Sequence, residues 1–279
     1  MLDRSSIASI ALAAAATAAA LALAGSPTQA FDESKYPDWK GQWDRTAAPR
    51  WADPAKAPLT AEYRAIFEEN LKDQATGGQG TDPTITCVSP GMPRIMNVYD
   101  PMEIVITPDT VHIFIEHVHD SRRIYTDGRS FSDGIEPTYA GYSIGTWIDE
   151  DQDGRYDVLA VETRHMRGPR SFDSTGLPLH HDNETVVKER IQLDKADRNI
   201  MHNEITVFDH ALTRPWTITK DYRRIAAARP VWREAVCAEG NQHVVIGNEN
   251  YFLSADGFLM PAKKDQKPPD LRYFKQATK

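Results

Sequence analysis

The sequence predicts a mainly β protein, an antiparallel barrel or a sandwich, with one helix outside the strands. Three observations lead to this fold class. Short segments rich in β-branched and aromatic residues recur between residues 102 and 246, turn dipeptides such as Asp127-Gly128 and Asp153-Gly154 separate them, and one earlier segment has helical spacing. Many short strands joined by tight turns are typical of these two architectures.

The first 30 residues have the order of a secretory signal peptide. Arg4 precedes an apolar run from Ile7 to Ala24, and Thr28-Gln29-Ala30 ends in the small residue of a cleavage site. An uncleaved membrane anchor is the alternative, but the run is mostly alanine, which inserts weakly. We therefore expect cleavage after Ala30, export to the periplasm or the medium, and no membrane contact afterwards.

The mature chain is expected to have three parts. Residues 31–101 form an arm, a helix and a loop packed on a barrel, residues 102–262 form the barrel, and residues 263–279 form a flexible tail. Three aromatic residues are expected to anchor the arm. A helix is expected to begin after an N-cap at Thr60, because four apolar residues follow it at helical spacing. The anchors are Trp39, Trp43 and Trp51, and the helical positions are Tyr63, Ile66, Phe67 and Leu71.

Nine segments between the arm and the tail have strand patterns, with period-two alternation or β-branched and aromatic enrichment. Turn residues separate them. They are Glu103–Thr107, Val111–His117, Arg123–Thr126, Tyr142–Ile148, Asp157–Thr163, Thr185–Leu193, Glu204–Phe208, Trp216–Arg223 and Arg233–Cys237.

Charge and cysteine content narrow the function classes. The 279-residue chain has a formal net charge of −8 without basic clusters, which argues against nucleic acid and anionic lipid as partners. Cys87 and Cys237 are the two cysteines, and we expect a disulfide because an exported chain folds in an oxidising compartment. Two buried free thiols are the alternative.

Seven sequence blocks together resemble a large group of uncharacterised exported bacterial proteins. They are RRIYTDGR, GYSIGTW, LAVET, GLPLHHDN, KERI, NEITVFDHALTRPWT and REAVCAEGN, in this order from Arg122 to Asn241. The resemblance implies a calycin-like or lipocalin-like β-barrel and no established activity. Many members of the group have a tight turn where this chain has DEDQDGRYD.

That acidic segment follows part of a calcium-loop pattern. Positions 1, 3, 5, 6 and 9 match, and the residue at position 7 offers a carbonyl. Ala160 stands where a bidentate glutamate is usual, so the predicted Ca²⁺ site is incomplete, and a solvated acidic turn is the alternative. The matching residues are Asp149, Asp151, Asp153, Gly154, Arg155 and Asp157.

Two histidine groups are candidate metal ligands. His117 and His119 leave the same face of a predicted strand, and His180-His181-Asp182 could supply further ligands from a loop. Half-exposed, hydrogen-bonded histidines are the alternative.

Three glutamates share strand faces with apolar neighbours: Glu116, Glu162 and Glu189. A carboxylate in such a position needs a cation or has a raised pKa. Three uses are open: internal pairs with arginine that fix the barrel register, a polar ligand pocket, or acid/base catalysis. The arginines considered as partners are Arg123, Arg190 and Arg214.

The leading functional prediction is binding of a small, partly apolar molecule inside the barrel. One alternative is a lyase, hydratase or isomerase with Glu162 or Glu189 as base and His181 as acid, and another is a structural envelope protein. No serine-nucleophile elbow, phosphate loop or dinucleotide fingerprint occurs. The sequence does not address the oligomeric state. The predicted ligand-binding residues are Glu116, Arg123, Tyr125, Glu189, Arg190, Glu204 and Trp216.

Overall fold

The computed structural model describes residues 31–48, 50–97, 101–116, 120–227, 229–233, 236–247 and 249–269. The expected signal peptide, the pair His117 and His119, and the tail beyond residue 269 lie outside these ranges. The chain divides into a short unit, Met1–Glu33, and a large unit, Ser34–Lys279, to which the description below applies. None of the described helices combines the length and apolar character that crossing a bilayer requires.

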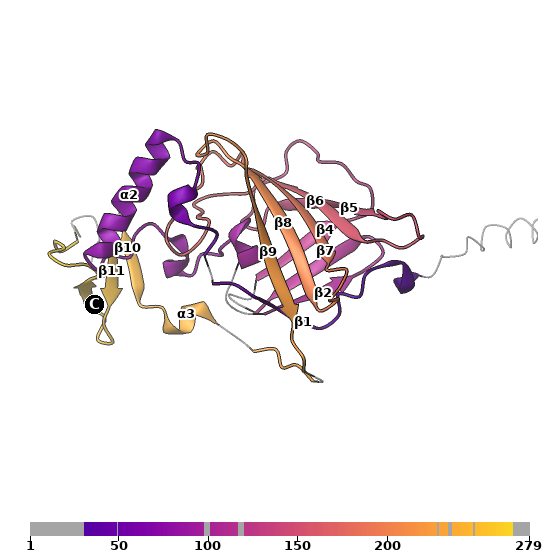
Figure 1. The fold of residues 1–279 in the computed structure, drawn as a ribbon. Coiled ribbons are helices and arrows are strands. Elements are labelled where there is room, and N and C mark those ends of the chain that lie inside the picture. The colour runs from indigo at the N-terminus through magenta and orange to yellow at the C-terminus, as the bar shows by residue number, and fades with distance from the viewer. Residues whose placement is uncertain are drawn as a thin grey trace, which may run out of the picture. The chain divides into compact units, whose positions relative to one another are not determined.

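Nine strands form a closed barrel in sequence order, and β9 pairs back onto β1 (Figure 1). Every pairing is antiparallel except β4 with β5. The predicted β-barrel class is thus confirmed, with one parallel pair in place of a wholly antiparallel sheet. The strands are β1 (Gln42–Arg45), β2 (Met102–Ile106), β3 (Thr110–Ile115), β4 (Asp120–Tyr125), β5 (Tyr142–Ile148), β6 (Val158–Arg164), β7 (Val186–Leu193), β8 (Ile200–Phe208) and β9 (Trp216–Arg224).

The parallel pair follows from the long connection after β4. Residues 126–141 separate the two strands, and β5 enters the sheet with Ile124 opposite Ser143 and Tyr125 opposite Ile144. A two-residue hairpin would force antiparallel pairing, whereas a long connection can return the chain to the end where β4 began.

Eight of the nine predicted strand segments correspond to β2–β9, and the ninth is wrong. Cys237–Gly240 is the short helix α3, and the backbone N–H of Arg233 donates to Glu116 Oε1 at 2.9 Å. A side chain thus takes the hydrogen bond that a neighbouring strand would need. The predicted arm also contains β1, which closes the barrel.

The barrel ends earlier than predicted, at β9. Three further strands, β10 (His243–Ile246), β11 (Glu249–Leu253) and β12 (Leu259–Pro261), form a separate antiparallel sheet. Just beyond it, Lys263 Nζ lies 3.0 Å from Asp73 Oδ1 and 3.1 Å from Glu249 Oε2. These ion pairs hold the first residue of the predicted tail.

Helix α2 (Ala61–Ala75) begins as expected, because the Thr60 hydroxyl accepts a hydrogen bond from the Tyr63 N–H at 3.3 Å. Its buried positions are Tyr63, Phe67 and Asn70. Ile66 and Leu71 are 41% and 42% exposed, so the buried stripe is narrower than the apolar pattern indicates. The remaining elements are short 3₁₀ helices: η1 (Glu33–Lys35), η2 (Pro54–Lys56), η3 (Pro83–Thr86) and η4 (Arg94–Asn97).

Buried side chains line the inside of the barrel. Burial alternates along β7, where Val187, Glu189 and Ile191 are buried and Lys188 and Arg190 are exposed. The inward-facing apolar residues belong to one buried cluster that also contains the predicted anchors Trp39, Trp43 and Trp51.

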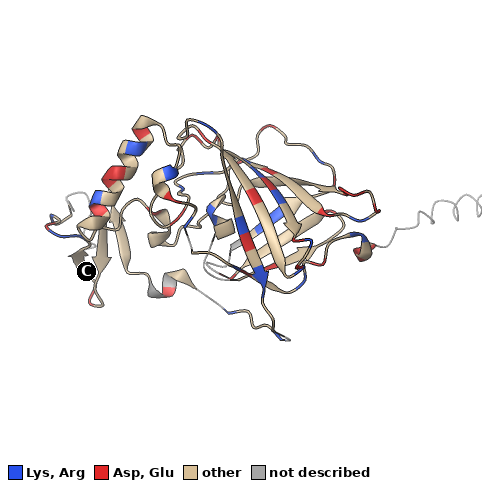
Figure 2. Ribbon diagram, in the orientation of Figure 1, with Lys and Arg blue, Asp and Glu red and all other residues tan. Residues whose placement is uncertain are grey.

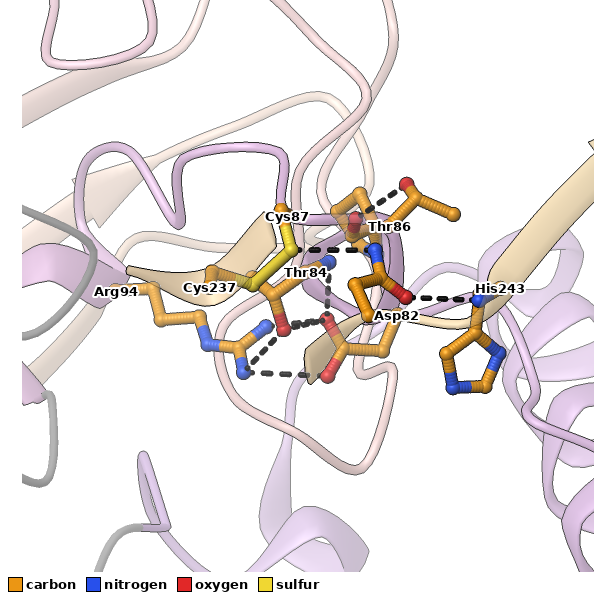
Figure 3. The surroundings of a disulfide bond; sticks show 9 residues. Asp82, Thr84, Thr86, Cys87, Arg94, Cys237 and His243 are labelled. Carbon is orange, nitrogen blue, oxygen red and sulfur yellow. Dashed lines mark hydrogen bonds and ion pairs between the residues drawn. A yellow bond between two sulfur atoms is a disulfide. The ribbon is translucent and has the colours of Figure 1, made fainter. Parts of the chain in front are cut away.

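The predicted disulfide between Cys87 and Cys237 is confirmed, with 2.10 Å between the sulfur atoms. Figure 3 shows it beside η3, where Arg94 pairs with Asp82 and where Asn241 Nδ2 donates to Cys87 Sγ at 3.2 Å. The bridge joins the connection between β1 and β2 to the segment after β9, over a sequence separation of 150.

Removal of this disulfide should lower the free energy of unfolding. For Cys87→Ser combined with Cys237→Ser we expect a loss of about 2–5 kcal/mol, because the unfolded chain regains the freedom of a long loop. Thermal unfolding of the wild-type protein with and without reductant measures the effect, and the double variant, insensitive to reductant, is the control. Equal melting temperatures in all samples would contradict the prediction.

Candidate functional site

The centre of the barrel holds a buried ion pair between Arg122 on β4 and Glu189 on β7. Both residues are nearly inaccessible, at 1% and 2% exposure. Arg122 Nη1 donates to Glu189 Oε1 at 3.0 Å, and Nη2 donates to Oε2. Arg122 also donates to the hydroxyls of Ser143 and Thr163, while Asn203 Nδ2 donates to Glu189. Both charged groups are thus committed to hydrogen bonds within the core.

Sequence reasoning considered the wrong arginine of this segment. Arg123 is exposed, whereas Arg122 lies on the buried face with Ile124. Alternation along the strand is the signal that could have identified it, because residues two apart share a face. The kind of interaction, an internal glutamate–arginine pair, was among the predicted possibilities.

The seven predicted ligand-binding residues do not line one cavity. Glu116, Glu189 and Trp216 are buried, while Arg123 and Arg190 are exposed. Of the two remaining residues, Glu204 is exposed and Tyr125 is half-buried. The physical reason is strand geometry, since adjacent residues such as Glu189 and Arg190 point to opposite faces of the sheet.

A groove of about 630 Å³ lies on the outer face of β5–β8. Each of these four strands contributes outward-facing side chains, and the connection after β4 adds residues at the rim. Two of the predicted ligand-binding residues, Arg190 and Glu204, present their side chains to it, whereas the side chain of Glu189 points into the core. The full lining is Arg129, Ser130, Phe131, Ile144, Thr146, Ala160, Val161, Glu162, Lys188, Glu189, Arg190, Glu204 and Thr206.

Arg129 holds the rim of the groove against the barrel. Its guanidinium lies 3.8 Å from the ring centroid of Tyr125, and Nη1 donates to the Tyr142 hydroxyl at 3.0 Å. Its Nε donates to Asp127 at 2.8 Å, and these hydrogen bonds lower the pKa of Asp127 to about 2. Tyr125 therefore supports the segment that carries Phe131 over the groove.

Charges of both signs lie side by side on these strands (Figure 2). Glu162 pairs with Arg164 at 2.6 Å and with Lys188 at 3.3 Å, and Arg190 pairs with Glu150. Glu204 faces the same groove, and within the described part of the chain no ion pair or hydrogen bond engages its side chain. Glu204 stands opposite Arg190 on the neighbouring strand, and Arg190 pairs with Glu150 instead.

The catalytic candidates have separate partners. Glu162 pairs with basic residues of β6 and β7, and Glu189 pairs with Arg122. His181 Nδ1 lies 3.1 Å from the hydroxyl of Tyr63 on α2. Among the described contacts, none joins His181 to either glutamate. The predicted lyase, hydratase or isomerase would need such a contact between its acid and its base.

The acidic segment between β5 and β6 forms a cluster that could hold a metal ion. Carboxylate oxygens of Asp149, Asp151 and Asp153 all lie within 4.8 Å of one another. Gly154, at φ +87°, allows the turn, and its N–H donates to Asp149 Oδ2 at 2.9 Å. The carboxylate of Asp157 instead accepts from the N–H of Glu150 at 3.0 Å.

No family model and no curated protein sequence matches the chain. The fold and the groove define a closed β-barrel protein whose outer face carries a groove lined by charged and apolar side chains. The resemblance to exported bacterial proteins stays a prediction.

Replacement of Arg122 should destabilise the barrel strongly. Arg122→Met leaves Glu189 as an uncompensated buried charge, and we expect a loss of about 3–5 kcal/mol in the free energy of unfolding. The matched control is Arg123→Met one position along β4, which should change it by less than about 0.5 kcal/mol because that side chain is exposed. Chemical denaturation measures both.

A double variant tests the cause. Arg122→Met with Glu189→Met removes both charges and should recover part of the stability lost in the single variant. Equal effects of Arg122→Met and Arg123→Met would show that the pair does not support the fold.

Proposed function

We propose that the protein binds a small, partly apolar molecule in the groove on the outer face of β5–β8. The observation that supports this is the unpaired carboxylate of Glu204 in a hollow that also exposes Phe131 and Ile144. Small-molecule sites combine apolar surface with a few placed polar groups, and volumes of about 300–1,000 Å³ are typical of them. The groove has this composition and size.

The charges favour a ligand that carries an amino group. Among the described residues that line the groove, Arg129, Lys188 and Arg190 each pair with a carboxylate, whereas Glu204 has no ion pair. A cationic group would pair with Glu204 while an apolar group covers Phe131. The lyase, hydratase or isomerase alternative has less support, because its acid and base have separate partners.

We infer that the protein acts outside the cytoplasm. The Cys87–Cys237 disulfide is typical of an oxidising compartment, and the expected signal peptide agrees with export to the periplasm or the medium.

The amine preference can be tested with 2-phenylethylamine and its neutral analogue 2-phenylethanol. We expect saturable binding of the amine in saturation-transfer NMR, weakened about tenfold by Glu204→Gln because a charge-assisted hydrogen bond is lost. Phe131→Ala should weaken binding of both compounds. Glu68→Gln, which removes an exposed carboxylate on α2, is the control that should bind normally.

Two results would overturn the proposed site. One is the absence of saturable binding of either compound, which would favour the structural alternative. The other is binding that Glu204→Gln and Phe131→Ala leave unchanged.

We also propose that the cluster of Asp149, Asp151 and Asp153 binds Ca²⁺ as a stabilising site. Three converging carboxylates are suitable ligands for a hard cation. The cluster also neighbours the groove, because Glu150 pairs with Arg190. Bound calcium would therefore stiffen one edge of the groove.

Calcium should raise the melting temperature, since an ion that binds only the folded chain stabilises it by mass action. We expect the rise in millimolar CaCl₂ to disappear in Asp151→Ala combined with Asp153→Ala and to persist in Asp133→Ala, which removes an exposed aspartate elsewhere. The absence of any calcium response in the wild-type protein would disprove this site.

A further inference from the structure

A second group of metal-ligating side chains lies where two connections of the barrel meet. His180 and Asp182 belong to residues 165–185, between β6 and β7, and His210 belongs to residues 209–215, between β8 and β9. Their ligand atoms all lie within 4.8 Å of one another. Two imidazoles and one carboxylate form a donor set that divalent transition metals favour.

Asp209 holds the two connections together behind this group. Its Oδ1 accepts hydrogen bonds from the backbone N–H of His180 at 2.9 Å and of Ala211 at 2.8 Å. Its Oδ2 accepts from the Thr185 hydroxyl at 2.6 Å. Through these backbone contacts, one carboxylate fixes the main chain beside both His180 and His210.

Two imidazole nitrogens of this group converge on one carboxylate oxygen, Asp182 Oδ2. The Nδ1 atom of His180 accepts from the Asp182 N–H at 3.2 Å and also lies 2.8 Å from Asp182 Oδ2. The first contact needs a lone pair on Nδ1 and the second needs a proton there, so one nitrogen cannot make both. Nδ1 of His210 approaches the same Oδ2. When both nitrogens are unprotonated, their lone pairs face Oδ2, and a cation among the three atoms would bind them all, taking the place of the Asp182 N–H at His180 Nδ1.

The group is also accessible to an ion from solvent. The side chains of His180 and Asp182 are 24% and 23% exposed, and that of His210 is 64% exposed. His210 also lines a groove of about 310 Å³ together with Glu184 and Arg214. The ring of His210 is therefore open to solvent on this side.

We propose that His180, Asp182 and His210 bind a divalent transition-metal ion of the Zn²⁺ class. His181 stays outside the ligand set because its Nδ1 contacts the Tyr63 hydroxyl. With bonds of about 2.0–2.1 Å, tetrahedral ligand atoms lie roughly 3.3 Å apart. Shifts of a few tenths of an ångström would therefore open the group for the ion, and the fourth position remains for water.

His202 on β8 provides a matched comparison. It also contacts two carboxylates, with Nδ1 at 2.7 Å from Asp221 and Nε2 at 3.1 Å from Asp194. These contacts use opposite ring nitrogens, so the three groups do not converge on one ion. His202→Ala thus removes a histidine between carboxylates without touching the proposed site.

The proposal can be tested on the full mature chain, purified without a histidine tag and dialysed against chelator. Titration with Co²⁺, followed by its visible absorption, should show one ion per chain, and Zn²⁺ should displace it. We expect His210→Ala and Asp182→Asn each to weaken Co²⁺ binding at least tenfold, and His202→Ala to leave it unchanged. Far-ultraviolet circular dichroism checks that the variants are folded.

Three results would overturn the proposal. The first is the absence of a saturable absorption change with Co²⁺ and of any saturable Zn²⁺ binding. The second is equal affinity in the wild-type protein, His210→Ala and Asp182→Asn, which would place the ion elsewhere, for example on the acidic cluster. The third is that His202→Ala loses Co²⁺ binding while His210→Ala and Asp182→Asn retain it.

Discussion

The buried pair of Arg122 and Glu189 is the constraint on which the barrel depends. Ser143, Thr163 and Asn203 complete it, so that each of the strands β4–β8 contributes one polar side chain. A buried charge is tolerated only when it is paired and hydrogen-bonded. A slip of one residue between neighbouring strands would turn a member of this network to the outside. The network therefore selects one register for five strands.

The same register decides what the outer face can bind. With Glu189 inward, Lys188 and Arg190 must point outward, beside Glu162 and Glu204 of the neighbouring strands. The parallel pairing of β4 and β5 adds the second component, because the long connection it requires carries Phe131 to the rim of the groove. The groove thus arises from a core constraint and a crossover acting together.

The two candidate ion sites differ in how they are built. The aspartates from Asp149 to Asp153 are close in sequence, so a local pattern was enough to predict them. The histidine group joins His180 and Asp182 to His210 across two connections, which Asp209 holds together. Such a site exists only once the barrel has brought its loops to the same place, and a hard cation and a transition metal would therefore occupy different parts of the molecule.

The sequence by itself determined the positions of β2–β9 and the N-cap at Thr60, because alternation and capping are local, and two cysteines allow one intramolecular pairing. Tertiary structure decided that Arg122 rather than Arg123 faces Glu189, that β1 closes the barrel, and that His210 joins His180. Alternation tells which residues share a face, but not which face is buried or which residue lies opposite. Those choices depend on contacts between segments far apart in the chain, which no local pattern encodes.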